Sequence, residues 1–172
     1  MMLVIDSATA ACSAALIGAD GEVIDARHEI VGRGHAERLL PMIADLLDGR
    51  VPDSILVDCG PGSFTGVRVG LAAAHGLAIG WKVPVAGYSS MAALAATSEE
   101  AETGVALVGG HGELFVQNYG GDPLAPGAGS EVSATVSLGR SRGITARVIG
   151  KATEAMLAAG ALESAANRIA SA

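Results

Sequence analysis

Short apolar runs and amphipathic stretches alternate along the first hundred residues of the chain. Apolar-rich stretches of five to nine residues predict strands, and apolar positions repeated every three or four residues predict helices. The Asp-Gly pair at positions 20 and 21 predicts a tight turn between two strands. The elements expected in chain order are strands over residues 3–7, 12–17 and 23–31, a helix over 34–48, a strand over 54–59, a helix over 65–79, a strand over 84–88 and a helix over 89–97.

This order predicts the fold class. Three antiparallel strands followed by alternating helices and strands require an α/β fold, in which a mixed sheet carries helices on both faces. The same order is found in the actin-like and ribonuclease-H-like (ASKHA) domain, so this fold is expected by analogy.

A polar, charged stretch at residues 99–104 is the best candidate for a boundary between two lobes. We therefore expect an actin-like N-terminal lobe over 1–98 and a second, C-terminal lobe over 105–172. In the second lobe, the runs 105–108 and 114–119 predict a hairpin around the turn 109–112. Weak strands over 132–138 and 147–150, and one or two Ala-rich helices, are expected to follow.

Charge and hydropathy narrow the classes of function. The 172 residues carry a net charge of −7, and an acidic surface repels phosphate backbones. If the protein acts on RNA, a partner is therefore expected to hold the RNA. No apolar run reaches the roughly 18 residues of a membrane span, and no basic signal segment opens the sequence. A cytoplasmic protein without membrane contact is expected.

Two segments are candidates for binding an anion or a nucleotide. The turn after the first strand carries Asp6, Ser7 and Thr9, although alanines stand where phosphate-binding turns use glycine. The loop 60–66 follows a buried strand and opens a helix, where Ser63 or Thr65 would cap the helix or face an anion. Neither segment has the P-loop pattern, and a purely structural role for both remains the alternative.

Small residues recur every fourth position in the helix that this loop opens. Gly66, Gly70, Ala74 and Ala78 would form one ridge that lets another element approach closely. The ridge can pack on the protein's own sheet or neighbouring helix, or it can form a subunit interface. The pattern leaves both open.

No metal site is expected from the sequence. The four histidines, at positions 28, 35, 75 and 111, show neither His-Glu-x-x-His nor another ligand spacing.

Three segments together resemble the TsaB (YeaZ) family. Residues 3–16 resemble its opening, and His-Ala-Glu-Arg-Leu-Leu-Pro-Met at 35–42 resembles its first helix, including the proline. Residues 60–70 match the signature Gly-Pro-Gly-Ser-Phe-Thr-Gly-Val-Arg-x-Gly, and Gly76, Leu77, Ala78 and Pro84 continue the match. The resemblance is specific over residues 1 to about 98 and implies the actin-like fold.

The resemblance also implies a function. TsaB-like proteins support formation of N6-threonylcarbamoyladenosine at position 37 of tRNAs that read codons starting with A. They pair with the catalytic paralogue TsaD and are joined by the ATPase TsaE, and a TsaC-type enzyme supplies threonylcarbamoyl-adenylate. A non-catalytic subunit is therefore expected, one that touches tRNA only through the complex and forms a homodimer when alone. No cofactor of its own is expected, and ATP or ADP at a subunit interface is left open.

The expected contacts with the partner subunit lie on the two helices. These interface residues are His35, Arg38, Leu39, Met42, Ile43, Gly66, Gly70, Ala73, Ala74, Leu77 and Ala78.

Two departures from related patterns bear on this reading. TsaD-like chains carry two metal-binding histidines where this sequence has Ser90 and Leu94, which implies a chain without that catalytic metal. The family's Asp-Ala-Arg-x-Gly-Glu run is replaced here by residues 108–113, and the second lobe is shortened.

The alternative function is a small actin-fold phosphotransferase or nucleotide hydrolase using Asp6 and the turn 109–112. A peptidase is disfavoured by the missing ligands.

Overall fold

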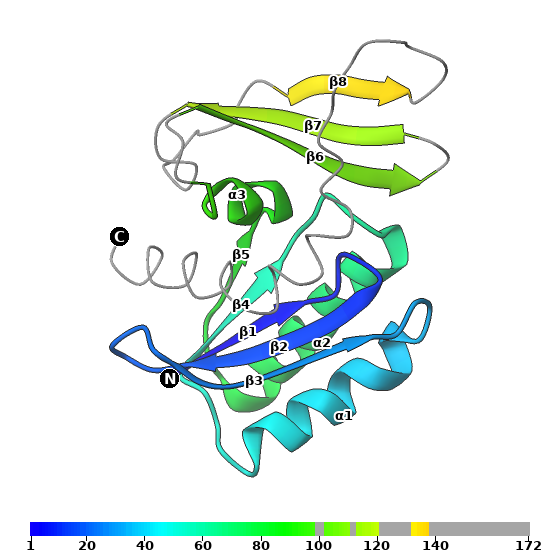
Figure 1. Ribbon diagram of the computed structural model, residues 1–172. Helices are drawn as coiled ribbons and strands as arrows, with labels where there is room; N and C mark the ends of the chain where they lie inside the picture. Colours follow the sequence, from blue (N-terminus) through cyan, green and yellow to red (C-terminus); the bar gives the residue numbers. More distant parts are fainter. Residues whose placement is uncertain (99–101, 111–112, 121–131, 138–172) are drawn as a thin grey trace.

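The computed structural model describes residues 1–98, 102–110, 113–120 and 132–137 (Figure 1). The elements appear in the predicted order. They are β1 (Met2–Asp6), β2 (Ala11–Ile17), β3 (Val23–Ile30), α1 (His35–Leu47), β4 (Ser54–Asp58), α2 (Phe64–Trp81), β5 (Val85–Tyr88), α3 (Ser90–Ala95), β6 (Glu102–Gly110), β7 (Glu113–Gly120) and β8 (Val132–Ser137).

The first five strands form one mixed sheet in the order β3-β2-β1-β4-β5. β2 is antiparallel to β1 and β3, whereas β4 runs parallel to β1 and β5. α1 and α2 cover one face of the sheet and α3 lies on the other (Figure 1). The predicted mixed sheet with helices on both faces is confirmed.

Alternation along each strand separates the two faces, because successive side chains point to opposite sides. Leu3 and Ile5 of β1 pack against the buried side of α1, where Leu39 and Leu46 lie. Val4 of β1 belongs to a separate cluster on the other face. The larger core therefore lies between the sheet and the pair α1 and α2.

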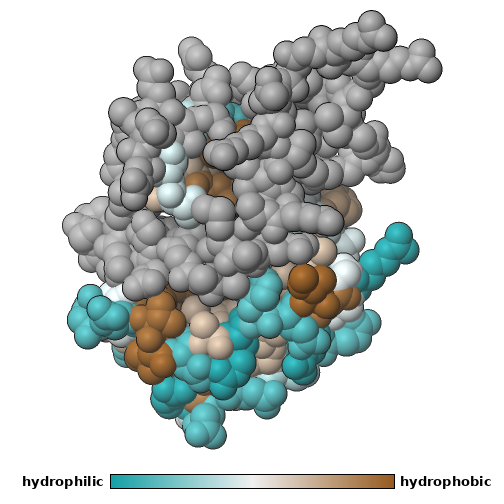
Figure 2. Space-filling model, viewed as in Figure 1, coloured by the Kyte–Doolittle hydropathy of each residue, from teal (hydrophilic) through white to brown (hydrophobic). Residues whose placement is uncertain are grey.

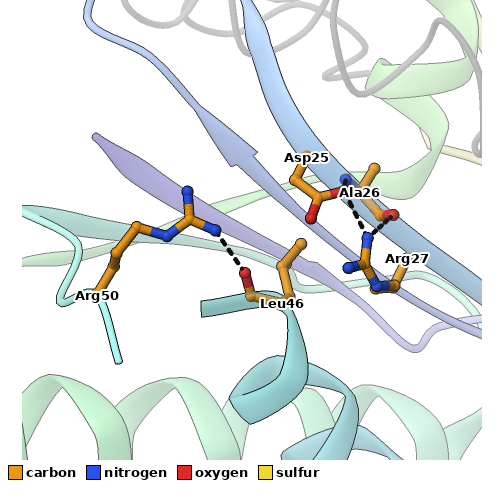
Figure 3. Close-up of polar contacts among 5 residues, drawn as sticks. All are labelled: Asp25, Ala26, Arg27, Leu46 and Arg50. Atoms are coloured by element: carbon orange, nitrogen blue, oxygen red, sulfur yellow. Dashed lines mark hydrogen bonds and ion pairs between the residues drawn. The ribbon is translucent and has the colours of Figure 1, made fainter. Parts of the chain in front are cut away.

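Backbone geometry and one arginine end α1. Asp48 and Gly49 both adopt positive φ, of 46° and 79°, which stops the helix. The Arg50 guanidinium then reaches back to α1, where Nη2 donates to the Leu46 carbonyl at 2.8 Å (Figure 3). Arg50 Nε donates to the Leu47 carbonyl, also at 2.8 Å. These bonds use carbonyls that a helix end leaves without an intrahelical partner.

A second sheet, of order β6-β7-β8, is antiparallel throughout. It packs on α3, where Val105, Leu107 and Tyr119 form a cluster with Met91 and Leu94. The predicted hairpin is present with longer strands than expected. The strand predicted over 147–150 and the predicted C-terminal helices lie outside the described residues, and the division into two lobes stays a prediction. No helix in the described ranges is long and apolar enough to span a membrane.

Candidate functional site

A row of polar side chains crosses the α3 face of the five-stranded sheet. The register pairs Ser13 with both His28 and Asp6, and it pairs Asp58 with Tyr88. β1 and β4 are adjacent and parallel, and the last pair in their register is Ile5 with Val57. Asp6 and Asp58 follow these two residues, so their carboxyls lie side by side. We call this set the polar row, which consists, from β3 to β5, of His28, Ser13, Asp6, Asp58 and Tyr88.

Asp6 ends β1 and is 2% exposed. Its Oδ1 accepts a hydrogen bond from the Ala8 backbone N–H at 2.9 Å. Burial raises the pKa of Asp6, and this effect outweighs the hydrogen bond from Ala8 and the nearby His28 and His35, which lower it. The carboxyl therefore holds its proton more tightly than an exposed aspartate does.

Asp58 ends β4 and is also 2% exposed. Its Oδ1 accepts from the Gly60 N–H at 2.6 Å, and the Ser90 hydroxyl lies 2.7 and 2.8 Å from its two oxygens. Burial, and then the charge of Asp6, raise the pKa of Asp58 to about 8. The site thus contains a carboxyl that is largely protonated at neutral pH when nothing else is bound.

Tyr88 closes the row at β5. Its hydroxyl is buried and finds no hydrogen-bond partner among the residues the structure describes. Burial, followed by the charges of Asp6 and Asp58, raises the pKa of this phenol well above its ordinary value. Tyr88 therefore stays neutral next to the two carboxyls.

The turn after β1 packs against the start of α2. The Ser63 N–H donates to the Ala8 carbonyl at 2.6 Å, and the Ser7 hydroxyl donates to the Gly66 carbonyl at 2.8 Å. A Cβ at Gly62 would lie 2.2 Å from the Ala8 oxygen, and one at Gly66 would lie 2.0 Å from the Ser7 oxygen. The signature loop therefore needs glycine at both positions for close backbone packing.

The candidate anion residues are only partly brought together. Of the two predicted caps of α2, Ser63 is the one observed, because its hydroxyl accepts from the Gly66 N–H. The side chain of Thr65 is exposed. Thr9 Oγ1 accepts from the Ala11 N–H within its own turn. Asp6 projects from the face opposite α2, because Ile5 before it packs on the α2 side. A nucleotide or anion at these residues stays a prediction.

Most of the expected interface residues face inward. The helix residues that pack within the fold are His35, Leu39, Met42, Ile43, Gly66, Gly70, Ala74 and Ala78. Ala74 is 0% exposed, and a Cβ at Gly70 would lie 2.6 Å from Ser7 Oγ. The ridge at spacing four therefore packs on the protein's own sheet, which corrects the expectation that these eight residues offer a surface to a partner.

The remaining three expected interface residues are less buried. Ala73 and Leu77 are partly buried against the core, and Arg38 Nε pairs with Glu29 of β3. Their part in an interface stays a prediction.

The opposite side of α2 is exposed. We call it the outer stripe of α2, and it consists of Phe64, Arg68, Ala72, His75 and Ile79. Phe64 is 70% exposed and Ile79 is 79% exposed, with the Arg68 guanidinium stacked 3.4 Å above the Phe64 ring centre. On α1, Leu40 is 49% exposed. Figure 2 shows apolar patches of this kind, in brown, on the half of the molecule that holds the five-stranded sheet.

A metal site and the phosphate turn 109–112 of the alternative function are two further kinds of site that the sequence raises. Within the described ranges, no group of three or more His, Cys, Asp or Glu side chains could hold a metal ion. His111 in the turn 109–112 lies outside the described residues, so the site of the alternative function cannot be assembled around it.

The sequence reasoning missed the polar row as a unit. The sequence places Asp58 and Tyr88 in strands only, and Ser90 enters only as the counterpart of a metal-binding histidine of TsaD-like chains. One signal was available, because Asp58 directly follows three consecutive apolar strand residues, and a charged side chain is seldom buried unless it has a partner.

Comparisons with known proteins agree with this architecture. A family model described as TsaD, tRNA N6-adenosine threonylcarbamoyltransferase, matches residues 23–139. The TsaB protein of Escherichia coli, a tRNA threonylcarbamoyladenosine biosynthesis protein, is 44% identical over 101 residues, 55% of this chain and 42% of the relative. Its Haemophilus influenzae counterpart is 40% identical over 58% of this chain and 43% of the relative.

Solved structures give the same result. YeaZ from Pseudomonas aeruginosa has a TM-score of 0.65 and 31% identity, covering 83% of this chain and 70% of that one. A second Pseudomonas aeruginosa structure, described as similar to peptidase YEAZ, has a TM-score of 0.62 and 34% identity over 69% of this chain and 58% of that one.

The sheet order and the helices on both faces define an actin-like, ribonuclease-H-like (ASKHA) α/β protein. Within that class, the chain belongs to the TsaB (YeaZ) family. It spans 42–43% of the length of the two curated TsaB relatives described above.

Proposed function

We propose that this chain is a non-catalytic partner subunit in the assembly that forms N6-threonylcarbamoyladenosine at position 37 of tRNAs reading codons that start with A. In this proposal it binds and organises a TsaD-like catalytic subunit, and a TsaE-like ATPase joins them. The observation that carries the proposal is 44% identity over 101 residues to a tRNA threonylcarbamoyladenosine biosynthesis protein.

The non-catalytic role is supported by two side chains. Ser90 and Leu94 stand where TsaD-like chains carry two metal-binding histidines. Ser90 is 2% exposed and donates its hydroxyl to Asp58, and Leu94 packs in the cluster below the second sheet. Neither can replace an imidazole as a ligand.

The surface that would bind the partner is the exposed side of α1 and α2. Leu40 on α1 and the outer stripe of α2 offer apolar area, which stabilises an interface by about 25 cal/mol per Å² removed from water. Arg68 on Phe64 adds the aromatic and arginine pair that is enriched at interface centres. The same surface would support a homodimer when the partner is absent, since a two-fold contact uses one patch twice.

The net charge of −7 supports an indirect contact with tRNA, which the partner subunits would hold. In this proposal the protein works in the cytoplasm. A bound ATP or ADP would lie at the interface between the subunits.

The test is association with the TsaD-like protein of the same organism, measured by size exclusion with light scattering. We expect a stable complex with the wild-type chain and a loss of at least tenfold in affinity for Ile79→Glu. The matched control is Ile24→Glu, because Ile24 is 49% exposed and belongs to the edge strand β3 rather than to either helix. Equal binding by Ile79→Glu and wild type would place the interface elsewhere, and no complex at all would refute the partner role.

A further inference from the structure

β3 forms one edge of the five-stranded sheet, and among the described strands β2 is its one neighbour. The strand is eight residues long, and the side chains of Ile24 and Ile30 on it are 49% and 60% exposed. A long edge strand with exposed apolar side chains offers its outward backbone N–H and C=O groups to a strand of another chain. Such an edge needs a feature that prevents the addition of a strand.

The pairing of β2 with β3 shows which backbone groups of β3 point outward. The Val31 N–H donates to the Ala10 carbonyl at 3.0 Å, and these residues continue the register in which Ala11 pairs with Ile30. In an antiparallel ladder, hydrogen-bonded pairs alternate with pairs that are not hydrogen-bonded. Ala26, opposite Ala15, falls at a pair of the second kind. Its N–H and C=O therefore point away from β2.

Both outward groups of Ala26 are occupied by the side chains of its two neighbours. The Ala26 N–H donates to Asp25 Oδ1 at 2.8 Å. Arg27 Nη1 donates to the Ala26 carbonyl at 2.9 Å (Figure 3). Arg27 Nη1 also pairs with Asp25 Oδ1 at 2.5 Å, so the two side chains bridge across the Ala26 backbone. We call these three contacts the edge clamp, and an incoming strand would have to break it to reach Ala26.

The edge clamp contributes little to the stability of the fold. The side chains of Asp25 and Arg27 are 36% and 43% exposed, and ion pairs at that exposure are weak. The hydrogen bond from Arg27 is the main cause that lowers the pKa of Asp25, so the carboxylate stays ionised at neutral pH and keeps accepting from Ala26. The position of the clamp on the edge, rather than its strength, indicates its role.

The clamp lies where the edge becomes regular. A register shift between Leu16 and Ile17 interrupts the ladder at the start of β3, and such irregularities make an edge a poor template for a new strand. From Asp25 to Ile30 the pairing with β2 has no shift. The edge clamp thus covers the first outward groups of the part of β3 that could accept a strand.

We propose that the edge clamp of Asp25 and Arg27 prevents β3 from pairing with β3 of a second copy of this chain. Antiparallel pairing of two identical edges is the simplest strand addition for a single protein, because a two-fold contact uses one edge twice. The clamp confines association of the chain to its other surfaces. The inference does not depend on the proposed function, since β3 and the outer stripe of α2 are different elements.

The experiment compares the full chain with Asp25→Ala/Arg27→Ala, a double variant that removes the edge clamp and leaves the net charge unchanged. The molar mass of each protein is measured by size exclusion with light scattering over a range of protein concentrations. We expect the double variant at high concentration to reach about twice the mass of the wild-type protein. Hydrogen exchange of residues 23–30 should then slow by about tenfold in the double variant and stay unchanged in wild type, because pairing protects the edge amides.

The matched control is Glu22→Ala/Arg33→Ala, which also removes one exposed acid and one exposed base, from the segments that flank β3. These two residues take no part in the edge clamp, so the control should keep the mass and the exchange rates of wild type. Arg27→Ala alone frees the Ala26 carbonyl and leaves Asp25 on the Ala26 N–H, so it should associate more weakly than the double variant.

Two results would overturn the proposal. A double variant with the wild-type mass at every concentration would show that the edge stays unpaired without the clamp. A larger mass without slower exchange in residues 23–30 would show that the copies associate through another surface. If circular dichroism shows that the double variant does not fold, Arg27→Ala decides the question by the same two measurements.

Discussion

The two faces of the five-stranded sheet differ in what their central strands bury. Toward α1 and α2, the buried residues of β1, β2 and β4 are apolar without exception in the main core cluster. Toward α3, the same strands bury Asp6, Ser13 and Asp58. Burying apolar area stabilises the fold by about 25 cal/mol per Å², whereas burying a carboxyl costs free energy unless it is compensated. The first face therefore explains why the chain folds, and the second points to a role beyond folding.

The largest expected effect tests the apolar face. Ala74 is 0% exposed at the contact between α2 and the sheet. Ala74→Arg would bury an unpaired charge and overpack the core, so we expect a loss of at least about 4 kcal/mol in the free energy of unfolding. That is comparable with the whole stability of a small domain, so the variant should lack a cooperative urea transition by circular dichroism.

The control for this variant is Ala72→Arg on the outer stripe of α2. It makes the same substitution at an exposed position two residues away. We expect its urea midpoint to match wild type, since exposed substitutions change stability by about 0.5 kcal/mol or less. A folded Ala74→Arg with a wild-type midpoint would contradict the assignment of the ridge to the core.

The apolar face could be predicted from the sequence because its signal is local. Leu39, Ile43 and Leu46 recur at helical spacing, and the strand predicted over 54–59 contains the apolar run 55–57. The direction in which the ridge faces could not be predicted in the same way. Small residues at spacing four permit close packing against any partner, and only the tertiary structure shows that Ser7 and the sheet fill that place.

The polar face is less predictable because its signal is distributed. Asp6, Ser13 and Asp58 are adjacent only through the register of three strands, and β4 joins β1 across a helix. The sequence reasoning identified Asp6 from its turn, but the local pattern carried no information about the strand that would lie next to it. The partner of a buried charge is thus decided by sheet topology rather than by local sequence.

The next expected effect, intermediate in size, is a pH dependence of the free energy of unfolding that comes from the polar face. The pKa of Asp58 is about 8 in the folded protein and 3.8 in the unfolded chain, so the folded state binds more protons between these values. The contribution of Asp58 to stability is fully present below about pH 4 and is lost as the pH rises toward 8. In metal-free buffer, the free energy of unfolding should fall by up to about 1 kcal/mol per pH unit in this window.

The measurement is a set of urea titrations between pH 5 and pH 9 on wild type and Asp58→Asn. The difference between the two proteins isolates this carboxyl from other titrating groups. We expect wild type to lose stability relative to Asp58→Asn as the pH rises. Parallel curves for the two proteins would show that Asp58 titrates alike in the folded and unfolded states.

The smallest expected effect lies at the edge of the apolar face, where Arg50 ends α1. Its guanidinium donates to the carbonyl of Leu46 (Figure 3) and to that of Leu47. These bonds place a positive charge at the negative end of the helix. Arg50→Ala should lower the free energy of unfolding by about 1 kcal/mol, measured by urea denaturation. The matched control is Arg27→Ala, which should leave the urea midpoint unchanged. Among the described residues, Arg27 pairs with Asp25 and the Ala26 carbonyl of its own exposed edge strand. Equal midpoints for Arg50→Ala and Arg27→Ala would show that α1 ends stably without the arginine, through the positive φ of Asp48 and Gly49 alone.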